Sequence, residues 1–202
     1  MASLIVYLAH PGNRYSRCNS AMAERARGLG GISFVDLYAE YPRFEVDIKR
    51  EQERLLGHDV ILLQFPLFWY AMPSLLKEWL DLVLETGFAY GVGGNRLKGK
   101  CLMAAITVAG RRDDFSGQGS EQHSIRGFLR PLERTVQVCQ MSFLAPYVLY
   151  GSLQAPDDGR LDAHVVGFVR LLEAIRDDRF ELGLAVEREF LDSGSLTAPL
   201  LS

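Results

Sequence analysis

Three aromatic side chains lie between two prolines in the stretch Pro66–Pro73, which reads Pro-Leu-Phe-Trp-Tyr-Ala-Met-Pro. The stretch follows Asp59–Phe65, a short apolar run that predicts a buried strand, and helical spacing of apolar residues begins after it. A stiff loop at a strand end can hold a large flat ring, because ligands bind at that edge of an open α/β sheet. Trp69 and Tyr70 could instead belong to the core, but their place outside a periodic element favours ring binding.

A second candidate binding segment is Ala9–Asn19, which is rich in turn-forming and hydroxyl residues and opens a predicted helix at Cys18–Leu29. A helix N-terminus offers unpaired N–H groups and a partial positive charge, which together bind phosphate. Ser16 could donate its hydroxyl, Arg17 could add charge and Asn19 could anchor the first turn. Ser16 could equally be only the helix cap. The segment is not a P-loop, because the sequence lacks a Gly-Lys-Ser/Thr pattern.

A third segment, Thr107-Val108-Ala109-Gly110, ends a predicted strand at Lys100–Val108. Small residues with a terminal glycine let the backbone approach a ligand closely. The polar stretch Arg111–His123 follows. It is long for a connection in an α/β domain, which favours a functional loop.

Predicted strands and helices alternate along the chain. The strands are Ser3–Ala9, Ile32–Leu37, Asp59–Phe65, Lys100–Val108 and Met141–Leu149, and the helices are Cys18–Leu29, Lys49–Leu56, Pro73–Leu84, Ile125–Val138 (with a start or kink at Pro131) and Leu161–Ile175. This alternation predicts a five-stranded parallel sheet with helices on both faces. The flavodoxin-like order 2-1-3-4-5, which carries a flavin at its switch point, suits it. We expect one domain over residues 1–202, with residues 191–202 as a loose tail.

The composition is ordinary for a soluble globular protein: 202 residues, 48% hydrophobic and 23% charged. A net charge of −3 argues against nucleic-acid binding. The longest apolar stretch, Phe65–Leu76, is too short to span a bilayer, and Met1–Ala9 lacks the basic start of a signal peptide. Cys18, Cys101 and Cys139 are odd in number and widely spaced, so neither a disulfide framework nor a metal site is expected. These features predict a cytoplasmic location.

Several motifs resemble the NAD(P)H:quinone oxidoreductase (DT-diaphorase) family over about residues 3–150. They are Pro66–Tyr70, Pro73–Asp81, Gly87-Phe88-Ala89-Tyr90-Gly91 and Leu97-Lys98-Gly99-Lys100. Within the family, the chain is most similar to the small flavoprotein that assists bacterial glutathione-gated potassium-efflux channels. The segments Tyr7–Pro11, Leu37-Tyr38 and Tyr41–Phe44 fit that branch.

The resemblance implies a flavin, with NAD(P)H and a quinone or related acceptor stacking in turn over it, in a homodimer. The implied flavin-binding residues are His10, Ser16, Arg17, Cys18, Asn19, Pro66, Leu67, Phe68, Trp69, Tyr70, Thr107, Val108, Ala109 and Gly110. FMN is favoured over FAD because the branch is short and has no obvious adenine-binding extension. Tyr70 and Phe115 are expected to contact the substrate. Hydride transfer to flavin N5 belongs to the cofactor, while the protein supplies stacking and orientation.

Two departures from the family pattern affect this expectation. The usual Thr-Thr-Gly-Gly is Thr107-Val108-Ala109-Gly110 here, which adds side-chain bulk near the ring. Phe115 stands where better-known members have a tyrosine, and His123, at an altered spacing, is the only nearby histidine. His123 is therefore the candidate catalytic proton donor.

Two other functions compete with the reductase. One is a redox-sensing regulatory subunit of a potassium-efflux transporter, peripheral at the inner face of the cell membrane. The other is an electron-transfer flavodoxin, although such proteins are typically more acidic and lack the aromatic-proline stretch.

Overall fold

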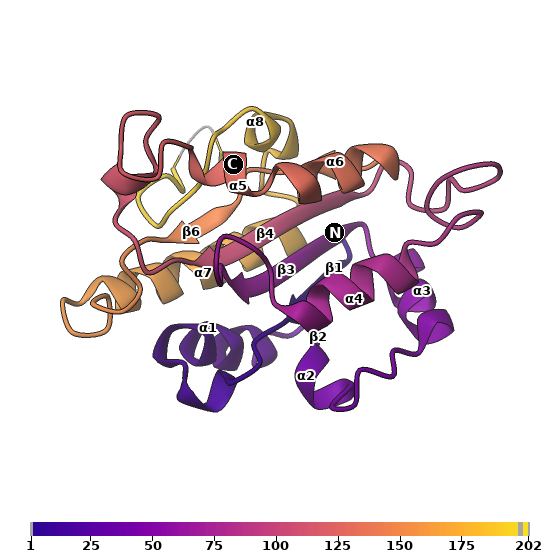
Figure 1. Cartoon of the computed structure of the whole chain (residues 1–202), viewed down its shortest axis with the longest axis horizontal. Coiled ribbons are helices and arrows are strands. Elements are labelled where there is room, and N and C mark those ends of the chain that lie inside the picture. Colours follow the sequence, from indigo (N-terminus) through magenta and orange to yellow (C-terminus); the bar gives the residue numbers. More distant parts are fainter. Residues whose placement is uncertain (1, 198–199, 202) are drawn as a thin grey trace.

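A parallel sheet forms the centre of the computed structural model, which describes residues 2–197 and 200–201 (Figure 1). Its strands are β1 (Leu4–Leu8), β2 (Ile32–Asp36), β3 (Val60–Pro66), β4 (Cys101–Thr107), β5 (Ser142–Phe143) and β6 (Tyr147–Leu149). The ladders run in the order β2-β1-β3-β4-β5, with β6 also paired to β4, and each of them is parallel. The expected flavodoxin-like sheet order is confirmed.

The fifth strand position is occupied by two short pieces rather than by one strand over Met141–Leu149. Both pieces, β5 and β6, pair with β4. Between them the N–H of Ala145 donates to the Ala185 carbonyl at 2.9 Å, away from β4. Pro146 follows and has no N–H to contribute to a ladder. The expectation of one continuous strand is therefore corrected to an interrupted one.

Helices cover both faces of the sheet, as expected (Figure 1). One face carries α1 (Arg17–Arg27) and α7 (Arg160–Arg176), and the other carries α3 (Ile48–Leu56), α4 (Ser74–Val83) and α6 (Arg130–Val138). Three further helices are short: α2 (Leu37–Glu40), α5 (Ile125–Phe128) and α8 (Leu182–Val186). Side chains of β1 alternate between the faces. Leu4 and Val6 pack in the cluster of Phe168, whereas Tyr7 lies 4.9 Å from Trp79 between ring centres.

The helix expected over Ile125–Val138 is divided into α5 and α6. Leu129 separates the two pieces, and Pro131 lies in the first turn of α6, where proline is tolerated. A helix start near Pro131 was among the expected outcomes. No helix within residues 2–197 and 200–201 combines the length and the apolar character needed to cross a membrane.

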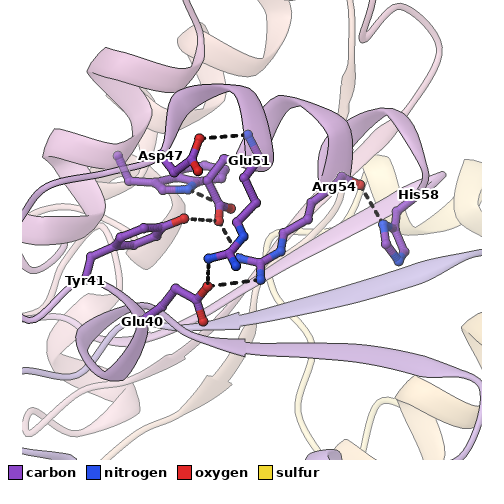
Figure 2. Close-up of polar contacts among 8 residues, drawn as sticks. Glu40, Tyr41, Asp47, Glu51, Arg54 and His58 are labelled. Carbon is purple, nitrogen blue, oxygen red and sulfur yellow. Dashed lines mark hydrogen bonds and ion pairs between the residues drawn. The ribbon is translucent and has the colours of Figure 1, made fainter.

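A buried carboxylate joins α3 to its neighbours (Figure 2). Glu51 is fully buried and accepts hydrogen bonds from the Tyr41 hydroxyl at 2.6 Å and the Trp79 indole N–H at 3.1 Å. Arg54 pairs with the same carboxylate at 2.5 Å and with Glu40 at 3.2 Å. We call Glu40, Tyr41, Glu51, Arg54 and Trp79 the Glu51 cluster. A buried carboxylate requires a positive charge and hydrogen-bond donors, and here Arg54 provides the charge while Tyr41 and Trp79 donate.

The C-terminal segment packs on the molecule, so the expectation of a loose tail is wrong for its described part, 191–197 and 200–201. Its buried side chains are Leu191, Leu196 and Leu200, all in the core cluster of α7. The N–H of Leu191 donates to the Pro146 carbonyl, and the N–H of Val148 donates to the Leu191 carbonyl, each at 2.8 Å. Residues 198–199 and 202 of the expected tail lie outside the described residues.

Candidate functional site

A cavity of about 320 Å³, here called the edge cavity, opens where the loops after β1, β3, β4 and β6 meet. Its volume falls in the range of small-molecule sites. The residues expected at a flavin that line it are His10, Ser16, Arg17, Cys18, Asn19, Pro66, Leu67, Phe68, Thr107 and Ala109. The other four expected residues, Trp69, Tyr70, Val108 and Gly110, belong to the same loops but do not line the cavity. The fold thus brings the three predicted segments to one place.

The start of α1 forms one wall of the edge cavity. Ser16 is the N-cap, and its side-chain oxygen accepts the Asn19 N–H at 3.1 Å. The hydroxyl proton of Ser16 stays available, so capping and phosphate binding are compatible. The N–H groups of Arg17 and Cys18, in the first turn, have no acceptor among the described residues, as is usual at a helix start. The Arg17 guanidinium pairs with Asp157 at 2.7 Å in solvent, where such a pair contributes little.

A buried amide and hydroxyl network lies behind this wall. Asn19 Nδ2 donates to Thr107 Oγ1 at 2.9 Å, and Gln64 Nε2 donates to the Asn19 carbonyl at 2.9 Å. The three residues come from α1, β3 and β4, so the network fixes the three loops relative to one another. Gln64 Oε1 is buried and lacks a protein partner within the part of the chain that the structure describes.

His10 lies at the base of the loop after β1 and is nearly buried. Its Nδ1 accepts the Gly12 N–H at 3.1 Å, which assigns the ring proton to Nε2. Desolvation is the main cause that lowers the pKa of His10, so the imidazole is neutral at neutral pH. The ring meets Phe68 edge-on at 5.6 Å between centres. A neutral histidine that lines the cavity provides a hydrogen-bond donor without adding charge.

The aromatic stretch forms a tight turn that exposes its largest side chain. Phe68 and Ala71 exchange two backbone hydrogen bonds of 3.0 Å, and Trp69 and Tyr70 between them have φ of 46° and 63°. Positive φ at both central residues defines a type I′ turn, which Asn and Gly normally occupy. Such backbone costs about 1–3 kcal/mol per residue and occurs mainly at functional sites. Trp69 is 92% exposed, which excludes the alternative that it is a core residue.

The segment after β4 uses its backbone in two ways. The N–H of Val108 donates to the Leu149 carbonyl at 3.0 Å, and the Val108 side chain is buried in the core. Val108 therefore does not add the bulk near a ring that the sequence suggested. The N–H groups of Ala109 and Gly110 have no acceptor among residues 2–197 and 200–201. Both remain available as donors, and Ala109 lines the edge cavity.

An aromatic group around Phe128 supports this edge. Tyr70 stacks on Phe128 at 5.1 Å, while Phe115 and His123 meet the same ring edge-on at 5.8 and 5.9 Å. Phe115 is buried, and a Cβ added at Gly110 would come 2.8 Å from its ring. Phe115 thus supports the loop from within, rather than offering an open surface to a substrate.

Tyr70 and His123 are the groups beside this edge that could carry a proton. His123 is exposed and Tyr70 is about half exposed. A hydrogen bond to Glu121 is the main cause that raises the pKa of the Tyr70 hydroxyl. The shared contact with Phe128 brings both side chains to one side of the aromatic turn.

The sequence did not predict two parts of the site: the cavity wall formed by the loop after β6, and Gln64 in the network behind the cavity. Ser152, Leu153 and Pro156 line the edge cavity, and Cys18 Sγ donates to the Ser152 carbonyl at 3.2 Å. Burial raises the pKa of the Cys18 thiol, so Cys18 is a packing residue rather than a nucleophile. Two features of the sequence could have indicated these residues. Gln64 is the one polar residue in an apolar strand, and residues 150–159 follow a strand end and are rich in Gly, Pro and Asp.

Known proteins share this fold. A model of the Flavodoxin_2 family, described as a flavodoxin-like fold, matches residues 1–170. The glutathione-regulated potassium-efflux system ancillary protein KefG of Cronobacter sakazakii is 41% identical over 149 residues, which are 74% of this chain and 81% of the relative. The structure of general stress protein 14 from Treponema denticola in complex with FMN has a TM-score of 0.80 at 30% identity, covering 86% of this chain and 99% of that one. An NADPH-quinone reductase from P. pentosaceus has a TM-score of 0.73 at 26% identity, covering 84% and 96%.

Proposed function

Because the chain belongs to the Flavodoxin_2 family, which confirms the resemblance found in its sequence, we propose that it is a flavin-dependent NAD(P)H:quinone oxidoreductase. The observation that carries this proposal is the edge cavity, where unused N–H donors, a neutral histidine and exposed aromatics meet. A bound flavin would take a hydride from the nicotinamide and pass two electrons to the acceptor. The FMN complex of a relative supports FMN over FAD.

The residues present fit an FMN. The N–H groups of Arg17 and Cys18 and the Ser16 hydroxyl would hold the phosphate, since a helix start favours an anion. The aromatic turn with Phe68 and Trp69 would cover the ring. The free N–H groups of Ala109 and Gly110 would stabilise negative charge on the reduced ring, because fixed dipoles need no reorganisation.

The test of this proposal is the colour and chemistry of the purified protein. We expect a yellow protein that releases one FMN per chain on denaturation, identified by mass and absorbance, and that oxidises NAD(P)H only when a quinone is present. A colourless protein that takes up neither FMN nor FAD, or one that is reduced by a one-electron donor but not by NAD(P)H, would refute it. The second result would favour the electron-transfer flavodoxin.

Quinone reduction takes up protons, and His123 is the residue that we assign to their delivery. It is exposed to solvent and lies beside Phe128. A general acid contributes about 10²–10⁴ in rate. His123→Ala should slow the oxidative half-reaction in stopped-flow and leave reduction by NAD(P)H unchanged, with Tyr70→Phe as the matched comparison. An unchanged oxidative half would remove His123 from the mechanism.

The protein is further proposed to act as a homodimer. A groove of about 320 Å³ between α4 and α6, lined in part by Leu84, Tyr90 and Val138, offers an apolar face to a second copy. Tyr90 and Val138 are 41% and 42% exposed. Val138→Arg should then give a monomer in sedimentation. Wild-type protein that is monomeric at micromolar concentration, with full activity, would contradict the dimer.

A second candidate function is that of an ancillary subunit of a potassium-efflux system, located in the cytoplasm at the inner face of the membrane. The observation that favours it is the 41% identity to KefG. Potassium efflux from cells that carry a glutathione-gated channel should rise when this protein is co-expressed. An unchanged efflux, together with active reductase, would leave only the enzymatic role.

A further inference from the structure

A second cavity, here called the arginine cavity, adjoins the edge cavity. It has a volume of about 610 Å³ and lies between the loop after β4 and the loop after β6. Both loops project from the carboxyl edge, at the left of Figure 1. Ala109 lines both cavities, so they lie side by side. A ligand whose one end lies in the edge cavity therefore has space for its other end here.

Arg160 is part of the wall of the arginine cavity. Its Nη1 donates to the Tyr150 carbonyl at 2.5 Å and its Nη2 to the Gly151 carbonyl at 3.1 Å. Asp158 pairs with the same guanidinium at 2.7 Å. The charge of Arg160 is thus matched, and the side chain holds the loop after β6 in shape.

Arg111 and Arg112 are paired less closely than Arg160, since among the described residues their nearest carboxylate contact is the 3.6 Å pair of Arg112 with Asp192. Arg111 forms no ion pair with the described residues, and its backbone N–H donates to Asp114 Oδ2 at 2.7 Å. Arg112 lies 4.6 Å from the Phe190 ring centre and 3.6 Å from Asp192, and its side chain is 64% exposed. Asp192 itself accepts the Ser195 hydroxyl at 2.6 Å. Both consecutive arginines line the cavity, and arginine suits a phosphate because it binds one with paired N–H groups.

We propose that the arginine cavity binds the adenosine half of NADPH, with Arg111 and Arg112 on its 2′-phosphate. The inference rests on the proposed reductase function and adds to it a preference for NADPH over NADH, which carries a hydroxyl at that position. The two cavities share Ala109 as a wall, so one molecule would place its nicotinamide at the flavin and its adenosine in the adjoining cavity. The high exposure of Arg112 suits a co-substrate that enters and leaves in every turnover, rather than a resident FAD.

The direct test measures the binding of two small probes to the flavin-loaded protein by calorimetry. The first, 2′,5′-ADP, carries the 2′-phosphate, and the second, 5′-AMP, lacks it. Arg111→Ala/Arg112→Ala should weaken 2′,5′-ADP about 10- to 100-fold, the scale of lost charged hydrogen bonds, with little change for 5′-AMP. The matched control is Arg25→Ala/Lys49→Ala, which removes two exposed charges far from the loops and should leave both probes unchanged.

Kinetics provide the second readout. The double alanine variant should raise KM for NADPH by a similar factor and leave kcat and the KM for NADH unchanged. Arg111→Lys/Arg112→Lys should recover part of the NADPH preference. An equal loss of both probes, an unchanged NADPH to NADH ratio, or a protein whose bound FAD prevents 2′,5′-ADP from binding would overturn the inference. Quinone reduction with NADH that persists in these cases would leave the reductase proposal intact.

Discussion

The Glu51 cluster and the network of Asn19, Gln64 and Thr107 are both buried and polar. They differ in whether their polar atoms all have a partner within the protein. The Glu51 carboxylate takes partners from Tyr41, Arg54 and Trp79, all within the protein (Figure 2). Among the residues that the structure describes, Gln64 Oε1 of the network behind the edge cavity has no protein partner, and the N–H groups of Ala109 and Gly110 have no acceptor. A saturated polar group stabilises packing, whereas a partly saturated one beside a cavity is prepared for a ligand. The difference separates a structural region from a binding region.

The largest effect on stability is expected from removing the carboxylate of the Glu51 cluster. Glu51→Ala leaves Arg54 without its buried partner and the Tyr41 and Trp79 donors without an acceptor, so unfolding free energy should fall by about 3–5 kcal/mol. Chemical denaturation of the flavin-free protein measures it. Lys77→Ala is the control, because its pair with Asp81 is about 60% exposed on each side chain and contributes about 0–1 kcal/mol. A Glu51→Ala effect as small as the control would contradict the structural role.

A fall in pH should act on the closed interior through His164. This residue is buried, stacks on Tyr147 at 4.3 Å, and has no partner for Nε2 among the described residues. Burial lowers the pKa of His164 from 6.5 to about 3, so below pH 6.5 only the unfolded chain takes up the proton. Stability from this group is complete above pH 6.5 and should fall by about 1.4 kcal/mol per pH unit between 6.5 and 3. His164→Phe should show a shallower acid slope in denaturation series, and equal slopes would rule the group out.

Changes at the wall of the edge cavity should mainly lower the affinity for the ligand. Ser16→Ala/Asn19→Ala removes the cap of α1 and the bond to Thr107, and FMN binding should weaken by about 1–3 kcal/mol. The stability of the flavin-free protein should fall less than in Glu51→Ala. Fluorescence titration of FMN and denaturation of the flavin-free protein separate the two effects. Retention of FMN at wild-type affinity would show that the phosphate lies elsewhere.

The smallest effect concerns the strained aromatic turn. Trp69→Asn places a residue that tolerates positive φ where Trp has φ of 46° and is 92% exposed. Unfolding free energy should rise by about 0.5–1 kcal/mol, because little packing is lost and strain is relieved. FMN affinity and quinone turnover should decrease at the same time. A variant that is both less stable and equally active would show that Trp69 is not held for function.

Local patterns made the sheet predictable. The apolar runs of β1, β3 and β4 and the proline at 73 are signals within a few residues, and they indicated the strands and the three loops. The strand order followed from the alternation of strands and helices, which suits a flavodoxin-like sheet. Trp69 and Tyr70 were found because aromatics in a loop are unusual. Their positive φ could not be read, since bulky residues seldom occupy a type I′ turn. Ser152 reaches the edge cavity, and Gln64 reaches Asn19 behind it, only through tertiary folding. The spacing of Leu191, Leu196 and Leu200 matched no helix or strand period.

The packed C-terminal segment has a consequence for solubility. The edge of β6 that faces away from β4 would otherwise present unpaired N–H and C=O groups to other molecules, and Leu191 occupies it with two hydrogen bonds. Exposed strand edges recruit strands from other chains and lead to aggregation. A chain shortened to residue 190 would keep the edge cavity residues and all of α7 but lose this cover. Such a fragment should self-associate through the exposed edge of β6. The C-terminal segment therefore protects the protein against aggregation by strand addition.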